Sequence, residues 1–385
     1  MKKDPSLRDF SSAQKRAQFL EKKLNISLDY ISQFSFTQDQ VEGRNIENLI
    51  GATQIPLGIA GPLKIKFGKT SKEYFIPLAT TEGALVASIS RGCKAIFQSL
   101  GAKVFVEETG MTRGPVFKTD NLEHSHKTKK WISDHFSKLA KVTEQTSNHL
   151  KLEKIGCRIV GRNLFARFYY DCSDAMGMNM VTIATEIAVS LIEQKTKASC
   201  VSVAGNFDID KKPAWLNFIS GRGKRVWAEV ILSPKVIKET LKTTPQKIAD
   251  VVYRKNQLGS IMSGSLGFNA HFANIIVSIF IATGQDPAHV VEGSTGITTA
   301  EILEGNNLYF SIYLPSLVIG TVGGGTQLPT QKEALKIMGV DGSQKVIELG
   351  SIIGGAVLAG ELSLISSLAE GSLAKAHKTL GRKGK

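Results

Sequence analysis

Apolar residues recur at helical spacing in some segments and form short runs in others, and this mixture predicts an α+β protein. Segment 77–101 is a strong helical case, because its apolar residues share one face. They are Leu85, Ile89, Ile96 and Phe97. Thr80 or Thr81 is expected to cap this helix, and Gly101 to follow its end. Glu82 is then expected at the helix N-terminus, where the helix dipole stabilises its anion and nearby apolar surface opposes it.

The middle of the chain gives the clearest pattern of elements. It predicts strands at 114–119, 150–160, 163–170 and 200–204, and helices at 121–145 and 175–194. The second helix is expected to bury one apolar face, formed by Met176, Met180, Ile183, Ile187 and Leu191. The order β-α-β-β-α-β is that of a ferredoxin-like, or split βαβ, unit. We expect this unit to occupy 114–204 as an insertion in a large domain built from 51–113 and 205–385.

The two ends of the chain are predicted to be helical. Residues 1–50 are expected to form a small helical region, with an amphipathic helix at 7–24. From Ala359 onward the pattern predicts a helix and then a basic tail. Residues 256–285 carry no formal charge and are long enough to span a bilayer. Because this stretch also contains His271 and Asn274 on one helix face, we interpret it as a helix buried in protein.

Composition narrows the class of protein. The 385 residues are 42% hydrophobic and 21% charged, which is typical of a globular chain. The four cysteines show no CxxC spacing and the histidines no HExxH spacing, so no metal site is predicted. The N-terminus has no apolar core of a secretory signal, and a cytoplasmic location without membrane association is expected.

The net charge of +14 fits nucleic acid, an anionic membrane surface or a polyanionic small molecule. The basic residues are dispersed and no nucleic-acid-binding motif accompanies them. A field that attracts phosphorylated cofactors is therefore the simplest interpretation, and no nucleic-acid partner is expected.

Four short segments carry candidate chemistry. Glu82 and Asp286 are acids beside apolar stretches, and repulsion between them would raise the pKa of one, giving an acid and a base. Lys211 precedes a lysine and a proline in a turn, where a fixed positive charge can stabilise an oxyanion. His377 lies between lysines and can donate a proton. Taken singly, each also fits an ordinary role: a helix cap, an exposed lysine pair, a solvated acid and a surface histidine.

Other segments offer anion binding. Arg91 and Lys94 follow Glu82 and either hold an anion or form a solvated basic face. Residues 173–180 open a helix after a strand, and residues 320–326 are rich in glycine, so both can offer backbone N–H groups to phosphate. A tight turn or a plain cap explains each equally well. No GxGxxG follows a strand, so a Rossmann dinucleotide site is not supported.

These segments together resemble the hydroxymethylglutaryl-coenzyme A (HMG-CoA) reductase family over about residues 45–380. The motifs, in the family's order, are ENLIG (47–51), PLATTEGALVAS (77–88), GMTRGPV (110–116), DAMGMNM (174–180), DKKP (210–213), GSIMSGSLGFNAHFAN (259–274), GQD (284–286), IGTVGGGT (319–326) and LAGELSL (358–364). DKKP and NAHFAN resemble the class found in eukaryotes and archaea.

The resemblance implies reduction of HMG-CoA to mevalonate and free coenzyme A by two hydride transfers from NADPH. It implies that Lys211 stabilises the oxyanion within a network with Asp286 and Glu82, that Glu82 delivers a proton, and that His377 protonates the coenzyme A thiolate. The substrate-binding residues it implies are Ser88, Arg91, Arg113, Asp210, Lys212, Lys255 and Asn274. The cofactor-binding residues it implies are Ser137, Lys138, Asp174, Met176, Gly177, Met178, Asn179, Val322, Gly323, Gly324, Gly325 and Thr326. It also implies an NADP-binding role for the inserted unit and a homodimer, or a larger assembly, with the site between subunits.

The chain departs from the animal enzymes at several positions. Ala204 replaces a substrate-contacting serine, and Ser90 and Ser372 replace an asparagine and a histidine near coenzyme A. Lys138 replaces an arginine, keeping the charge but losing the bidentate fork, and a preference for NADPH over NADH is still expected.

Two other function classes fit parts of the sequence. One is a non-catalytic acyl-coenzyme A or nucleotide binder on the same scaffold, and the other is a basic protein that binds nucleic acid or a membrane surface. Turnover of NADPH separates the reductase from the first, and salt-dependent binding to DNA or vesicles would identify the second.

Overall fold

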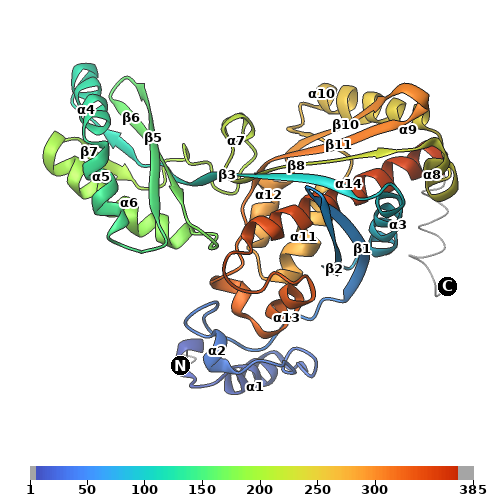
Figure 1. The fold of residues 1–385 in the computed structure, drawn as a ribbon. Helices are drawn as coiled ribbons and strands as arrows, with labels where there is room; N and C mark the ends of the chain where they lie inside the picture. The colour runs from blue at the N-terminus through green and yellow to red at the C-terminus, as the bar shows by residue number, and fades with distance from the viewer. Residues whose placement is uncertain (1–5, 372–385) are drawn as a thin grey trace.

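The computed structural model describes residues 6–371 of the chain. Figure 1 shows two lobes joined through the long strand β3 (Ala102–Arg113), with a small helical segment from the N-terminus against the larger lobe. Three clusters of buried apolar side chains underlie this arrangement, with members mainly from 60–102 and 226–365, from 111–200, and from 13–49.

The larger lobe is a mixed sheet with helices. Its strands are β1 (Leu57–Phe67), β2 (Thr70–Ala79), β3, β8 (Gly223–Leu232), β9 (Gly267–Phe268), β10 (Gly296–Ile302) and β11 (Leu308–Leu317). Its helical elements are α3 (Leu85–Gln98), α7 (Trp215–Ser220), α8 (Pro234–Val236), η2 (Ile237–Leu241), α9 (Pro245–Val251), η3 (Val252–Gly259), α10 (Ser260–Ser263), α11 (Phe272–Thr283), η4 (Pro287–His289), α12 (Val290–Gly293), η5 (Glu304–Asn306), η6 (Gly324–Gln327), α13 (Pro329–Ile337) and α14 (Val346–Glu370). The strand order β3-β8-β11-β10-β9 runs across the lobe, and β1 joins β2 to β3.

Helix α14 forms the centre of this lobe. It packs on α3, on α11 and on the sheet, and Figure 1 shows it running along the sheet. Glycine makes the close crossings possible. A Cβ on Gly92 of α3 would lie 1.9 Å from the Ala359 carbonyl oxygen, and one on Gly360 would lie 2.3 Å from Ile275 of α11. Glycine at these two crossings therefore lets α3 and α11 approach α14 closely.

The smaller lobe has the predicted order of elements. They are β4 (Val116–Lys118), α4 (Leu122–Asp134), α5 (Phe136–Glu144), β5 (Lys151–Val160), β6 (Asn163–Asp171), α6 (Met178–Thr196) and β7 (Ser199–Ser202). The strands lie in the order β7-β4-β6-β5, and each neighbouring pair is antiparallel. Two central strands are therefore flanked by the strand that follows each helix.

Strand β3 belongs to both lobes. Its residues 103–110 pair with β8, and Met111–Arg113 pair with β6. A register irregularity falls between Glu108 and Gly110, and Gly110 has a φ of 84°. Glycine adopts this left-handed backbone without steric cost, so the strand can turn from one sheet into the other at this residue.

The N-terminal helical segment consists of η1 (Leu7–Asp9), α1 (Ala13–Leu24) and α2 (Gln38–Val41). Arg16, buried in α1, donates hydrogen bonds to the carbonyl oxygens of Leu7, Phe10 and Leu49. The Arg16 guanidinium thus links the residues before α1 to the residues that follow α2. The amphipathic helix predicted at 7–24 therefore begins only at Ala13.

The predicted start of α3 is wrong. The helix begins at Leu85, and Ala84 before it adopts a left-handed φ of 77°. Thr80 does not cap the helix, because its hydroxyl accepts the N–H of Glu82 at 3.0 Å. Glu82 therefore lies in an exposed turn ahead of the helix. Phe97, assigned to the buried face, is 37% exposed.

Three other expectations also need correction. The helix predicted at 121–145 is two helices that divide at His135. In α6 the fully buried face is formed by Val181, Ala184, Thr185, Ala188, Val189 and Ile192. Of the predicted face, Met176, Met180 and Leu191 are partly buried against the same core, whereas Ile183 and Ile187 are exposed. The helix predicted from Ala359 begins at Val346, so Ala359 lies in its middle.

The charge-free stretch 256–285 is not one helix. It contains parts of η3, α10, β9 and α11, and only α11 is a regular buried helix. In the part of the chain that the structure describes, α14 alone is long and apolar enough to cross a membrane, and 83% of its most apolar window is buried inside the protein. That burial is typical of a core helix.

Candidate active site

The loop before α7 presents Lys211 to Asp286. The Lys211 Nζ lies 2.8 Å from Asp286 Oδ2, and both side chains are partly exposed. Asn206, Ile209 and Lys211 all have a left-handed φ near 55–60°, a backbone conformation that costs energy for residues with a Cβ. The loop is therefore held in a strained form that aims the ammonium group at the carboxylate.

Hydrogen bonds control the charge of Asp286. Burial opposes its ionisation, but hydrogen bonds from Lys211 and the Ala288 N–H, together with the charge of His289, outweigh burial and hold the pKa of Asp286 below its usual range. Repulsion between Asp286 and Glu82 was expected to raise the pKa of one of these two acids. At Asp286 the direction is the opposite.

Glu82 forms a second pair with another predicted residue. Its Oε2 accepts a hydrogen bond from Asn274 Nδ2 at 2.5 Å. Asn274 lies in the first turn of α11, and the carboxylate of Glu361 fixes the residues before that helix by accepting the N–H groups of Ala270 and His271. The position of Glu82 thus depends on the loop before α11, which Glu361 of α14 fixes by hydrogen bonds.

The two pairs lie at opposite ends of α11. Asn274 is in its first turn, and Asp286 follows Gly284, which ends it. The helical residues between them span roughly 13 Å at 1.5 Å per residue. Among the described residues no hydrogen bond or ion pair joins Glu82 to Lys211, and the two pairs are called the half-sites below. His377 and Ser372 lie outside the residues that the structure describes.

The remaining predicted substrate-binding residues divide into three groups. Asp210, Lys212 and Arg113 lie near Lys211: Lys212 Nζ donates to the Asp210 carbonyl oxygen at 3.2 Å, and Arg113 pairs with Asp208 at 3.3 Å.

Ser88 and Arg91 are instead held by α14. Ser88 lies 2.9 Å from the Ser363 hydroxyl, and Arg91 donates to Ser363 and Ser367. Burial lowers the pKa of Arg91. Lys94, on the same helix, is exposed, and so is Lys255, which lies in η3. Among the described residues, no hydrogen bond or ion pair links Lys255 to either half-site.

A buried polar network behind Lys211 was not predicted. Arg222 donates to Glu292 at 2.6 Å and to Asp210 at 3.0 Å, and both Arg222 and Glu292 are fully buried. Glu292 also accepts from Asn217 at 3.0 Å and lies 2.5 Å from His289 Nδ1. Sequence reasoning missed these residues because a charged side chain reveals neither its burial nor its partner. Only the spacing of Asp286, His289 and Glu292 at helical intervals hinted that they meet.

Three of these side chains offer metal-ligand atoms within 4.8 Å of one another: Asp210, His289 and Glu292. The guanidinium of Arg222 already bonds to both carboxylates and supplies the positive charge that they need. This donor set fits a buried arginine and does not call for a metal ion.

The two glycine-containing segments meet, as cofactor binding would require. Ala175 forms a parallel bridge with Val322, and the Thr321 N–H donates to the Asp174 carbonyl oxygen at 2.8 Å. Gly177, which has a φ of 91°, is the residue before α6. The first backbone N–H groups of that helix therefore lie a few residues along the chain from the bridge at Ala175. A Cβ added at Gly323 or Gly324 would meet no described atom within 4 Å. Met176, Met178, Asn179, Gly325 and Thr326 complete these segments.

The carboxylate of Asp174 has a structural partner. It accepts the N–H groups of Gln344, Lys345 and Val346 at 2.6, 3.0 and 3.1 Å and so caps α14. Burial opposes ionisation, but these three hydrogen bonds lower the pKa of Asp174. The side chain therefore joins the smaller lobe to the central helix of the larger one.

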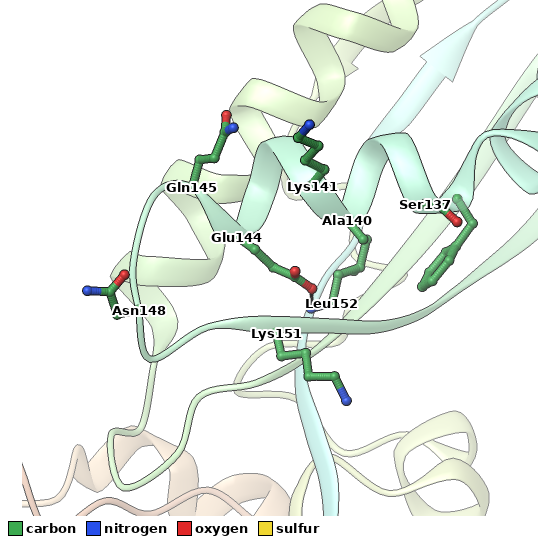
Figure 2. Close-up of a pocket in the computed structure, with 9 residues that line it drawn as sticks. Ser137, Ala140, Lys141, Glu144, Gln145, Asn148, Lys151 and Leu152 are labelled. Carbon is green, nitrogen blue, oxygen red and sulfur yellow. Dashed lines mark hydrogen bonds between the residues drawn. The ribbon is translucent and has the colours of Figure 1, made fainter.

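Ser137 and Lys138 lie at the start of α5, and both are exposed. Figure 2 shows Ser137 at one side of an open pocket of 670 Å³ lined also by Lys141, Glu144 and Lys151. Lys138 does not line this pocket. Two lysines at its rim make the pocket a candidate for an anionic group.

Comparison with known proteins places this geometry in a family. A chain named 3-hydroxy-3-methylglutaryl-coenzyme A reductase from Methanocaldococcus jannaschii is 52% identical over 373 residues, covering 95% of this chain and 92% of that protein. The similarly named reductase 2 of Solanum tuberosum is 40% identical, covering 97% of this chain and 64% of that protein. The solved reductase of Streptococcus pneumoniae matches 94% of this chain and 99% of its own with a TM-score of 0.70 at 19% identity, which supports the fold. A family model described as hydroxymethylglutaryl-coenzyme A reductase matches residues 12–382, and the chain therefore belongs to the hydroxymethylglutaryl-coenzyme A reductase family.

Proposed function

We propose that this chain reduces HMG-CoA to mevalonate and coenzyme A by two hydride transfers from NADPH. The observation that carries the proposal is the pair formed by Lys211 and Asp286 at 2.8 Å. The preformed ammonium group can stabilise the oxyanion that develops when hydride reaches a carbonyl carbon. Glu82 is assigned to proton delivery and His377 to protonation of the thiolate.

NADPH is assigned to the smaller lobe. The antiparallel strand order β7-β4-β6-β5 supports a ferredoxin-like unit at 114–204, and the separate apolar core of this lobe supports its treatment as a domain inserted between 51–113 and 205–385. The bridged loops at Ala175 and Val322 offer backbone donors to phosphate, with Ser137 and Lys138 assigned to the additional phosphate of NADPH. Residues 1–50 are assigned to a separate helical region, and the small cluster formed by Ala13, Val41 and Leu49 supports this assignment.

A homodimer is proposed because one chain carries the two half-sites at opposite ends of α11. A second copy related by a two-fold axis can bring the Glu82–Asn274 end of one chain to the Lys211–Asp286 end of the other. Lys255, which is exposed and makes no hydrogen bond or ion pair with either half-site in the described part of the chain, is available to the substrate carboxylate in such an assembly. The cytoplasmic location stays a prediction.

The first experiment follows NADPH oxidation by absorbance with HMG-CoA as substrate. Wild-type protein is expected to turn over, and Lys211→Ala to lose at least about a hundredfold in kcat, because the oxyanion loses its fixed charge. Lys247→Ala, a lysine outside both half-sites, is the matched control. Substrate binding without turnover by the wild type would favour the non-catalytic alternative.

A second experiment tests the shared site. Co-expression of Lys211→Ala with Glu82→Gln should restore about one quarter of wild-type activity, since half of the dimers are mixed and each holds one intact site. A mixture that remains as inactive as its parents contradicts assembly between subunits. The same kinetics with NADH and in the direction of mevalonate oxidation determine cofactor preference and reversibility.

A further inference from the structure

His289 lies directly behind the Lys211–Asp286 pair and is fully buried. Its Nδ1 is 2.5 Å from Glu292 Oε1, and its Nε2 is 3.8 Å from Asp286 Oδ2. The Nε2 atom is buried and has no hydrogen-bond partner among the residues that the structure describes. Buried polar atoms are rarely left without a partner, so this nitrogen calls for an explanation.

The neighbours of His289 determine which nitrogen carries a proton. Glu292 accepts a hydrogen bond at 2.6 Å from the permanently charged guanidinium of Arg222, so its carboxylate oxygens face His289 as acceptors. The short contact to Nδ1 therefore assigns a proton to Nδ1. The remaining nitrogen, Nε2, is then the one that gains or loses a proton, and it faces Asp286.

We infer that His289 is a positioning residue for the proposed reduction, and that the proton on its Nε2 controls how firmly Asp286 holds the ammonium group of Lys211. With the proton present, a positive imidazolium faces the Asp286 carboxylate and keeps it ionised. Without the proton, the lone pair of Nε2 faces the carboxylate, and the hydrogen bonds from Lys211 and the Ala288 N–H maintain its charge. The inference rests on the proposed function, because its consequence is a change in catalysis.

The charged groups around the imidazole come from three segments. Asp286 and Glu292 flank it on its own stretch of chain, Asp210 approaches Nδ1 at 3.9 Å from the Lys211 loop, and Arg222 reaches both Glu292 and Asp210 from the residue before β8. Lys211 completes the set through Asp286. Three carboxylates and two fixed cations therefore surround His289, and its proton decides the net charge of the group.

The direction of the effect follows from these charges. The positive charge of His289 is one of the influences that lower the pKa of Asp286. Removing the imidazole should therefore raise the pH at which Asp286 takes up a proton and releases Lys211. Opposite charges at about 4 Å typically shift such a value by one unit or more.

The experiment compares the pH profiles of kcat and kcat/KM for wild type and His289→Gln, with NADPH and HMG-CoA. Glutamine is close in size to histidine, can donate its amide N–H groups to the neighbouring carboxylates and carries no charge. We expect the acidic limb to move upward by about one pH unit and kcat at neutral pH to fall about tenfold, with little change in KM for either substrate. The matched control is His124→Gln, which removes a partly buried histidine that is also bonded to a carboxylate but lies in the smaller lobe.

Coincident pH profiles for wild type and His289→Gln would overturn the inference while leaving the proposed reductase intact. An inactive wild type would instead reject the proposed function. If His289→Gln does not fold, as judged by loss of a cooperative thermal transition, wild-type protein labelled with ¹⁵N-histidine answers the question. One imidazole should then show an Nδ1 proton protected from exchange with solvent and an Nε2 that titrates, and a spectrum with no such ring contradicts the inference.

Discussion

The two ends of α11 hold their polar groups by different means. At the first end, Glu361 is fully buried, and within the described residues its donors are all neutral: the N–H groups of Ala270 and His271 and the hydroxyl of Thr298. At the other end, Glu292 is equally buried, but one of its principal partners is the guanidinium of Arg222. One carboxylate orders backbone, and the other balances a charge.

Because of this difference, we expect the two half-sites to respond to different kinds of change. A carboxylate held by neutral N–H donors fixes geometry, so the Glu82–Asn274 end is expected to respond mainly to changes in shape. A carboxylate held by fixed cations belongs to a coupled set of charges, so the Lys211–Asp286 end is expected to respond to pH and to the removal of a single charge.

Glu292→Gln tests the charged end most severely. It leaves Arg222 buried with Asp210 as its remaining carboxylate partner, and breaking a buried ion pair costs about 3–5 kcal/mol of unfolding free energy. Urea denaturation measures the loss. Asp250→Asn, which breaks the exposed pair with Arg254, should leave the midpoint unchanged. A loss below about 1 kcal/mol for Glu292→Gln would show that the two ends do not differ in this way.

Glu361→Gln tests the neutral end. It replaces one accepting oxygen with an amide that faces N–H donors, which should cost about 2 kcal/mol because a buried donor is left unpaired. The loss should be the same at low and high salt, unlike a loss caused by broken ion pairs. The exposed Glu301→Gln serves as the control. A strongly salt-dependent loss would argue that Glu361 also balances a charge.

Asn274→Ala tests the hydrogen bond between Asn274 and Glu82 at the same end of α11. Glu82 loses its amide partner, and a hydrogen bond to a charged group contributes about 1.5–3 kcal/mol, so kcat should fall about tenfold or more. Thermal stability should change little, because Glu82 is exposed. Asn163→Ala, in the smaller lobe, is the control for steady-state kinetics. Undiminished turnover in Asn274→Ala would separate this pair from the reaction.

Asp286→Asn should have the smallest effect on stability, below about 1 kcal/mol, because both partners of the ion pair are partly exposed. The pKa of Asp286 is lowered in the folded protein, so its contribution is present above the ordinary aspartate value of 3.8 and is lost as the pH falls through the folded value. The difference in Tm between variant and wild type should therefore be greatest near neutral pH and shrink below about pH 4. A difference that grows on acidification would mean that Asp286 is stabilised in its protonated form.

The family motifs named Glu82, Asn274, Lys211 and Asp286 as site residues, where residue type alone left an ordinary role open for each segment. The structure pairs them two by two, and their roles stay predictions. The network around Arg222 could not be found in this way, because Arg222 and Glu292 are separated by 70 positions and nothing local marks either as buried. Periodicity gave the elements of the smaller lobe in the correct order. It misjudged part of the inner face of α6, because that helix carries apolar residues on more than one face and periodicity alone does not say which face is buried.

Strand β3 has a consequence for any attempt to treat the smaller lobe as a transferable module. Because Met111–Arg113 pair with β6 before the predicted boundary at residue 114, a fragment cut there would expose the backbone edge of a central strand. Such a fragment would be prone to self-association, whereas one that retained these three residues would keep that edge covered. The predicted domain boundary at residue 114 therefore does not coincide with the point at which the smaller lobe could be cut out with its sheet intact, which lies before Met111.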